Sequence, residues 1–211
     1  MSVSKNLFIL KRRNKIVMKE IPLVFGISGV ARCGKDTLAA HLIDKLEKVK
    51  LPCVRSAFAD ALKRDLDDFT KEKLSISSFT ENTAEKNIIR PLLVAYGTHV
   101  CRNQVDKDFW IKKIEKLISV SISNRIITVI PDVRYENEVR WIKQQGGFVI
   151  HLTRMGMKPS NFEEKSNDPI IKKLADYKIR WKTFSDEKET CQYHINKLFF
   201  SQGWSTYGSF K

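Results

Sequence analysis

The nine residues GVARCGKDT, at positions 29–37, decide the expected fold because they match the pattern G-x-x-x-x-G-K of a phosphate-binding loop. The apolar run at residues 23–28 comes directly before them and predicts a buried strand. After them, apolar residues recur at helical spacing from Lys35 until Pro52 ends the pattern. Strand, glycine-rich loop and helix form the context in which this motif binds nucleotide phosphates.

The composition of the loop suits the triphosphate of a nucleotide. Its glycines allow backbone N–H groups to point inward around phosphate oxygens, and the N-terminus of the next helix adds a partial positive charge. A lysine at the end of the loop can reach the β and γ phosphates. We expect the triphosphate to contact Gly29, Arg32, Cys33, Gly34, Lys35, Asp36 and Thr37.

The residue after Lys35 departs from the common form of the loop. Asp36 stands where a serine or threonine hydroxyl usually binds Mg²⁺, and the hydroxyl follows one place later as Thr37. In this respect the loop resembles that of some nucleoside monophosphate kinases, which favours a small-molecule kinase over a motor-type ATPase. Two roles stay open for Asp36: it holds Mg²⁺ through water, or it stabilises the first turn of the helix. Asp36 and Thr37 are therefore the candidate metal ligands.

Further strands and helices alternate along the chain. Apolar or β-branched runs predict additional strands at residues 53–58, 125–130, 148–152 and 177–181. Helical spacing of apolar residues predicts helices near residues 62–69, 88–96, 109–121 and 136–145. The alternation predicts an α/β fold, a three-layer sandwich of the P-loop NTPase type with a parallel sheet of about five strands and helices on both faces.

Three details of this pattern are expectations about where elements end. The Ser-, Thr- and Asn-rich sequence at residues 70–85 has little periodicity and predicts an exposed loop. The helix near residues 88–96 is expected to break at Gly97. The strand at residues 125–130 is expected to end before Pro131.

Length and composition exclude several classes of protein. A chain of 211 residues suits one α/β domain with a small inserted lid. The four cysteines and four histidines have no metal-ligand spacing, so we expect reduced thiols, a cytoplasmic location and no structural metal. No apolar run approaches the length that a membrane span needs, so no membrane association is expected.

The net charge of +14 indicates polyanionic partners. Nucleotides and nucleic acids both qualify, and the charge allows weak, non-specific binding of nucleic acid. Residues 1–20 form a locally basic extension, which we interpret as a solvated arm in preference to a specific nucleic-acid site.

Arginines and carboxylates at the ends of strands and helices are the candidates for a second, acceptor side. Asp132 and Arg134 follow the strand at residues 125–130, at the edge where doubly wound sheets bind ligands. Asp132 could act on Mg²⁺ or on the acceptor and Arg134 on a phosphate, and a local ion pair between them is the alternative. Trp110 is either a core residue or a platform for a base. The remaining candidates are Asp60, Lys63, Arg90, Thr98, Arg102 and Arg154.

Six segments together resemble the deoxynucleoside monophosphate kinases of tailed bacteriophages. They are the loop at 29–37, FADALK at 58–63, residues 90–102 with YGT at 96–98, DFW at 108–110, DVRYENE at 132–138 and residues 146–154. Their order and spacing match as well, from about Leu23 to Arg154. The resemblance implies a P-loop kinase fold, ATP with Mg²⁺ as the donor, and a deoxynucleoside diphosphate as the product.

The resemblance also implies roles for residues at matching positions. Lys35 and the loop amides would hold the ATP phosphates, and Arg154 would begin a lid at about residues 154–170, although residues 155–168 lack the usual lid signature. The kinase domain would span residues 21–200, with an acceptor-binding helical region at about 60–123 and a tail at 201–211. The acceptor side would contain Arg90, Arg102, Asp132, Arg134 and, within the same motifs, Glu138.

Two alternatives remain open at this point. A kinase of the same fold could act on another small phosphorylated acceptor, of the phosphomevalonate or dephospho-CoA type. A catalytically weak P-loop protein could instead bind nucleic acid or sit in a phage assembly. The sequence leaves the oligomeric state open, with a homodimer as one option, and a phage-encoded protein would lie in the cytoplasm of the host cell. The accepted bases do not follow from the sequence.

Overall fold

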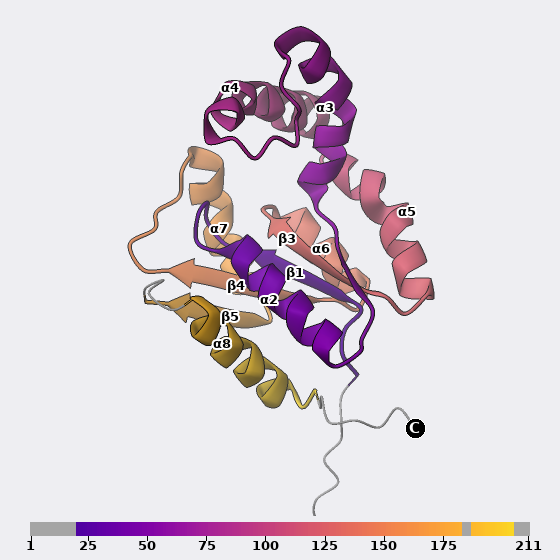
Figure 1. The fold of residues 1–211 in the computed structure, drawn as a ribbon, viewed down its shortest axis with the longest axis vertical. Helices are drawn as coiled ribbons and strands as arrows, with labels where there is room; N and C mark the ends of the chain where they lie inside the picture. Colours follow the sequence, from indigo (N-terminus) through magenta and orange to yellow (C-terminus); the bar gives the residue numbers. More distant parts are fainter. Residues whose placement is uncertain (1–19, 183–186, 205–211) are drawn as a thin grey trace, which may run out of the picture.

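A five-stranded parallel sheet forms the centre of the protein in this computed structural model, which describes residues 20–182 and 187–204 (Figure 1). The strand order is β2-β3-β1-β4-β5. The strands are β1 (Val24–Ser28), β2 (Cys53–Arg55), β3 (Ile127–Val133), β4 (Phe148–Arg154) and β5 (Tyr177–Trp181). All five residues of β1 are buried, so the predicted central strand is confirmed.

Helices cover both faces of the sheet. On one face, α2 (Lys35–Lys48) and α8 (Glu187–Gln202) pack against Phe25 and Ile27 of β1. On the other face, α5 (Phe109–Ser123), α6 (Glu136–Gln144) and α7 (Phe162–Leu174) pack against Val24. Successive side chains of a strand point to opposite faces, which is why neighbouring residues of β1 belong to different cores. The predicted three-layer α/β sandwich is confirmed.

The long connection between β2 and β3 holds most of the remaining helices. It contains α3 (Phe58–Leu74), α4 (Thr83–Val94), the π-helix η1 (Ala95–Val105) and α5. Figure 1 shows α3 and α4 at the top of the view, on the opposite side of the sheet layer from α8. Among the described helices, none is both long and apolar enough to cross a membrane.

The prediction of an exposed loop at residues 70–85 is partly wrong, because α3 continues to Leu74 and α4 begins at Thr83. Thr70 is fully buried, and its hydroxyl group forms a hydrogen bond with that of Ser78. A polar residue therefore occupies a position on the buried face of α3. Lys71 pairs with Asp67 one turn earlier at 2.6 Å. Polar residues therefore maintain a helix that apolar periodicity alone does not indicate.

The helix break predicted at Gly97 is wrong as well. The chain passes through Gly97 as part of η1, whose hydrogen bonds span five residues instead of four. A Cβ atom at Gly97 would lie 2.7 Å from Cδ2 of Leu62 on α3. The glycine permits close packing of η1 against α3 and does not end the helix.

Two strand ends also differ from the expectation. β2 stops at Arg55, because Phe58 already starts α3. β3 continues through Pro131 to Val133, where the pairing with β1 shifts register between Gly26 and Ser28. A proline has no N–H for a regular ladder, and an irregular register is a place where strands tolerate it.

The predicted extension and tail lie mostly outside the described residues. Of residues 1–20 only Glu20 is described, so the interpretation of the basic arm is outside what the structure covers. At the other end α8 continues to Gln202, and Trp204 is buried against Phe25 and Phe148, with ring centroids 5.5 and 4.9 Å apart.

Candidate functional site

The loop between β1 and α2 has the backbone geometry of an anion-binding turn. Gly34 precedes α2 with a φ of 100°, and Gly29 has a φ of 137°. A Cβ atom at Gly29 would lie 2.2 Å from the carbonyl oxygen of Leu152, so only glycine fits there. Arg32 also has a positive φ, of 61°. The loop therefore bends tightly over the carboxyl end of β1, and its amides lie at the N-terminus of α2.

Lys35 is the cation of this loop, and it is buried against the loop backbone. Its Nζ donates to the carbonyl oxygen of Val30 at 2.8 Å. Burial lowers the pKa of Lys35, with a further lowering from Arg134 and an opposing effect of Cys33 and Glu164. Burial also raises the pKa of the Cys33 thiol. To contact a phosphate, the ammonium group of Lys35 exchanges one backbone carbonyl for phosphate oxygens.

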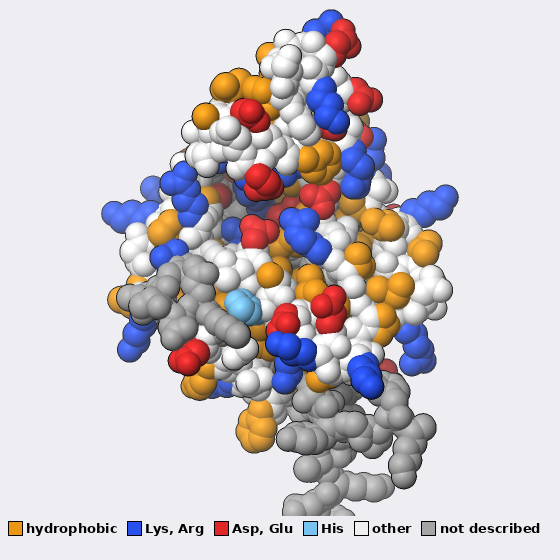
Figure 2. Space-filling view, in the orientation of Figure 1, with side chains coloured by type: hydrophobic (Ala, Val, Ile, Leu, Met, Phe, Trp, Pro, Cys, Tyr) orange, Lys and Arg blue, Asp and Glu red, His pale blue; other side chains and the backbone are white. Residues whose placement is uncertain are grey.

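A cavity of about 510 Å³ opens between this loop and the helices of the β2–β3 connection. Figure 2 shows a hollow below α3 and α4, with acidic and basic side chains gathered around it. The acceptor-side residues predicted from the sequence, apart from Arg154, meet in its lining: Asp60, Lys63, Arg90, Thr98, Arg102, Trp110, Asp132, Arg134 and Glu138. Asp36, the candidate metal ligand of the loop, lines it as well. Arg154 ends β4 and does not contribute to this lining.

Asp132 holds the start of α3. Its Oδ1 accepts the N–H of Phe58 at 3.1 Å, and its Oδ2 accepts the N–H of Ala59 at 2.8 Å. Burial raises the pKa of Asp132, against the effects of Ala59, Arg134 and Phe58. Both carboxylate oxygens thus satisfy helix N-terminal donors, and α3 in turn carries Asp60 and Lys63 to the cavity. In this structure Asp132 holds the start of α3, and its predicted contact with Mg²⁺ or the acceptor stays a prediction.

Arg102 and Glu138 form a buried ion pair at 2.6 Å. Glu138 also accepts the backbone N–H groups of Arg134 and Tyr135, at 2.7 and 3.1 Å. The Tyr135 ring stacks on the guanidinium group of Arg102, 3.8 Å from the ring centroid. Burial raises the pKa of Glu138 to about 7, although Arg102 and these N–H groups act in the opposite direction. Both members of this buried pair line the cavity.

The rest of the DVRYENE motif ties α6 to the turn before α5. Asn137 donates to the carbonyl oxygen of Lys107 at 2.8 Å and to Asp108 at 2.7 Å. Trp110 is 4% exposed, and its Nε1 donates to the carbonyl oxygen of Gly97 at 2.9 Å. Of the two roles that the sequence left open for Trp110, this geometry favours a core residue that supports η1.

Arg134 differs from Arg102 because its side chain is exposed enough to contact a ligand. It is 53% exposed, and its nearest carboxylate, Glu164, lies 3.9 Å away. The alternative of an ion pair with Asp132 does not appear among the ion pairs of the described residues. Arg90 is exposed and also lines the cavity, and the Nζ of Lys63 lies 5.4 Å from the Phe79 ring.

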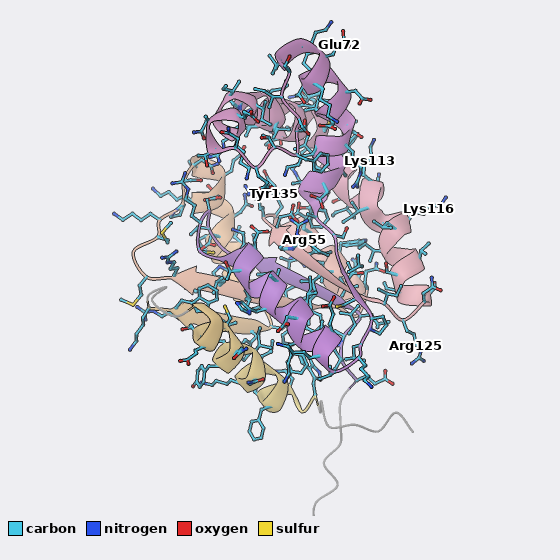
Figure 3. The ribbon with its side chains drawn as sticks, in the orientation of Figure 1. Arg55, Glu72, Lys113, Lys116, Arg125 and Tyr135 are labelled. Atoms are coloured by element: carbon cyan, nitrogen blue, oxygen red, sulfur yellow. The ribbon has the colours of Figure 1, made fainter. Side chains whose placement is uncertain are left out.

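Sequence reasoning missed Arg55, at the carboxyl end of β2. Its guanidinium group pairs with Asp60 at 3.0 Å and approaches Asp36 at 3.6 Å. Figure 3 shows Arg55 between α2 and the start of α3, which carry Asp36 and Asp60. Arg55 thus joins the donor loop to the first acceptor helix. Because the strand was predicted at residues 53–58, Arg55 lay inside it, and nothing in the sequence indicated that the strand ends at Arg55, at the edge of the sheet where ligands bind.

Sequence reasoning also missed Glu164, in the first turn of α7. Its Oε2 accepts the N–H of Ala31 in the loop at 3.2 Å, together with the N–H and hydroxyl of Ser160, both at 3.0 Å. Burial acts to raise the pKa of Glu164, but these hydrogen bonds and Arg134 outweigh it, so the pKa is lowered. The sequence at residues 155–168 carries no motif that indicates this contact.

The residues around the loop fit a nucleotide and its metal ion. A carboxylate oxygen already occupies the amide of Ala31, which shows that the loop accepts a negatively charged oxygen. The Asp36 side chain is 83% exposed, and Thr37 is its neighbour in the first turn of α2. Carboxylate and hydroxyl oxygens are the ligand types that Mg²⁺ prefers, together with water and phosphate.

Comparisons with known proteins agree with this arrangement. The model of the family described as deoxynucleotide monophosphate kinase matches residues 53–168. The deoxynucleotide monophosphate kinase of Enterobacteria phage T4 is 28% identical over 112 residues, which are 50% of this chain and 44% of that protein. A relative from Acanthamoeba polyphaga mimivirus is 25% identical over 156 residues, 64% of this chain and 76% of that protein. The match thus spans less than half of the phage protein.

A solved structure of shikimate kinase from Acinetobacter baumannii in complex with shikimate aligns with a TM-score of 0.45 and 12% identity. The alignment covers 88% of this chain and 97% of that one.

Proposed function

The chain belongs to the deoxynucleotide monophosphate kinase family, and on that premise we propose that it transfers the γ-phosphoryl group of ATP to a deoxynucleoside monophosphate. The observation that carries the proposal is the wall that the loop and the cavity share. Ala31 and Asp36 of the loop line the same space as Arg90 and Arg134. A triphosphate on the loop would present its terminal phosphoryl group to a molecule in that space.

The size and lining of the cavity suit a nucleotide. Its volume of about 510 Å³ lies within the range of roughly 300–1,000 Å³ of small-molecule sites. Ile89, Leu93 and Val94 of α4 line the cavity and would supply apolar surface for a base. Arg90 and Lys63 would bind the phosphate of the acceptor, and Arg134 would neutralise charge on the transferred group.

The reaction needs positioning and neutralisation of charge and no general base. At neutral pH a phosphate monoester is largely ionised already, since its second pKa is about 6. One of its oxygens forms a bond to the γ-phosphorus while the bond from that phosphorus to the β–γ bridging oxygen breaks, and ADP leaves with the electron pair. The engagement of both Asp132 oxygens in holding α3 is compatible with this chemistry.

Lys35 and the loop amides would bind the β and γ phosphates of ATP. Asp36 and Thr37 would hold Mg²⁺, which supplies further positive charge to these phosphates when bound. Arg102, Glu138 and Tyr135, which contact one another in the lining of the cavity, would help to keep bulk water from the reacting group.

A coupled assay of ADP release tests the proposal with ATP, Mg²⁺ and each deoxynucleoside monophosphate in turn. We expect turnover that depends on the acceptor and is abolished in Lys35→Ala. Lys48→Ala is the matched control, because Lys48 is exposed on the same helix and pairs only with Asp44 among the described ion pairs. The proposed acceptor would be contradicted if phosphomevalonate or dephospho-CoA supported ADP release and none of the deoxynucleoside monophosphates did.

A further inference from the structure

Glu164 connects the donor loop and the acceptor side through its two carboxylate oxygens. One oxygen, Oε2, accepts the N–H of Ala31 in the loop at 3.2 Å. The other, Oε1, lies 3.9 Å from Nη1 of Arg134. The side chain is only 10% exposed, although it belongs to the first turn of a helix at the mouth of the cavity. An acidic group from α7 is therefore enclosed between an amide and a guanidinium group that both suit phosphate.

This position is the one that a phosphoryl group of the donor would need. The loop amides face the donor phosphates, and Arg134 is the exposed arginine beside them. A carboxylate shares negative charge and paired oxygen acceptors with a phosphoryl group, but it carries less charge and has fewer oxygens. The geometry thus resembles a site in which an internal anion has taken the place of the external one.

We propose that Glu164 is an internal anion that occupies a phosphoryl position of the donor site and must leave it when ATP binds, an inference that rests on the proposed function. Glu164 satisfies the Ala31 amide and partly neutralises Arg134. ATP then competes with a tethered carboxylate for the same donors. Without Glu164 the triphosphate would bind to a vacant amide and an unpaired arginine.

Release of Glu164 would also change the acceptor cavity. Ser160 donates two hydrogen bonds to this carboxylate, and the side chain of Asn161 accepts the N–H of Glu164 at 2.8 Å. Ser160, Asn161, Glu163 and Glu164 all line the cavity. A shift of Glu164 away from the loop therefore moves part of the acceptor wall and frees Arg134, so that ATP binding prepares the acceptor side.

Equilibrium binding of ATP, measured by calorimetry on the full chain with Mg²⁺ and without an acceptor, tests the proposal. Glu164→Gln keeps the shape and an acceptor oxygen for Ala31 but removes the charge. Because hydrogen bonds to charged groups contribute more than neutral ones, we expect the Kd for ATP to fall by about tenfold. Glu164→Ala, which removes the competitor entirely, should lower the Kd at least as much.

Glu72→Gln is the matched control, because Glu72 is a 70% exposed carboxylate at the far end of α3 (Figure 3). It should leave the Kd for ATP unchanged. An unchanged or raised Kd in both Glu164 variants, with folding verified by circular dichroism, would overturn the proposal. Turnover does not enter this test, so a failure of the proposed acceptor chemistry in the ADP-release assay stays distinguishable from a failure of this inference.

Discussion

The donor loop and the acceptor cavity are built in different ways. The loop is one continuous run, residues 29–37, whose geometry depends on its own glycines and on the strand and helix beside it. The cavity is assembled from β2, α3, α4, η1, β3 and α7, which are distant in the chain. The family match begins at residue 53, after the loop. The motif and the family thus give independent support to the two halves of the site.

The charged side chains of the loop and of the cavity also differ in what they contact. The loop lysine contacts a backbone carbonyl, while most charged groups of the cavity contact one another. Arg102 is 8% exposed and bound at 2.6 Å, whereas Arg134 is 53% exposed with its partner at 3.9 Å. A motif arginine in the cavity therefore serves either the fold or the substrate. The predictions below test this division, from the largest expected effect to the smallest.

Arg134→Ala should lower kcat/KM on the order of a thousandfold, the scale of a transition-state arginine. The melting temperature should stay near that of the unmodified protein, because the side chain is half exposed and has one distant partner. Steady-state kinetics and thermal melting measure the two effects. Arg134→Lys should restore only part of the rate, since lysine keeps the charge but not the forked donors. Equal losses of stability and rate would assign Arg134 to the fold.

Arg102→Ala should destabilise the protein by about 3–5 kcal/mol, because it leaves the buried carboxylate of Glu138 without its partner. Urea denaturation measures the free energy of unfolding, and Arg134→Ala is the comparison. A stable Arg102→Ala protein with a raised KM for the acceptor would instead show that Arg102 binds substrate directly.

Gly29→Ala should cost about 2–4 kcal/mol and weaken ATP binding, because its Cβ would meet a backbone oxygen at a φ that alanine rarely adopts. Gly97→Ala should cost only about 1 kcal/mol, since its Cβ would meet the flexible end of Leu62. Urea denaturation and calorimetry with ATP compare them. Equal costs at both glycines would contradict the difference between a rigid donor loop and an adaptable acceptor wall.

Glu138→Gln tests whether burial or the ion pair with Arg102 decides how the Glu138 carboxyl group affects stability as the pH changes. A carboxyl group whose pKa rises from 4.5 to about 7 on folding stabilises the fold below pH 4.5, and this contribution is lost as the pH rises through about 7. The stability advantage of the unmodified protein over Glu138→Gln should therefore shrink by roughly 1 kcal/mol or more across that window. Urea denaturation at several pH values measures it. An advantage that grows with pH would mean that Arg102 outweighs burial.

Local features of this fold could be predicted from the sequence, and long-range ones could not. The buried strand, the glycine loop and the following helix depend on neighbouring residues, so periodicity and spacing predict them. Gly97 looked like a helix break because its reason, contact with Leu62, lies in another helix. Residues 70–74 looked like a loop because they lack apolar periodicity, whereas an ion pair and a buried threonine maintain the helix there.

The same limit applies to the site. Residue types and strand ends indicated which side chains would surround the cavity, and the structure brings most of them together. Burial decides their roles, and a single sequence does not show burial. From the sequence alone, Arg102 and Arg134 are equally plausible phosphate ligands. In the structure Arg102 is buried in an ion pair with a carboxylate, whereas Arg134 is half exposed. Glu164 lies 133 residues from Ala31 in the chain, so no local pattern could connect them.

The strand order has a consequence for how the protein is made. Among the described strands, β1 pairs with β3 and β4. Val24 pairs with Thr128 of β3, and Ser28 pairs with His151 of β4. During synthesis from the N-terminus, this apolar strand has no sheet neighbour until about a hundred further residues have left the ribosome. The helices at residues 58–123 are complete before then. The part of the protein that shapes the acceptor cavity can therefore gain local structure first, and the ATP loop takes its final geometry only after the sheet closes around β1.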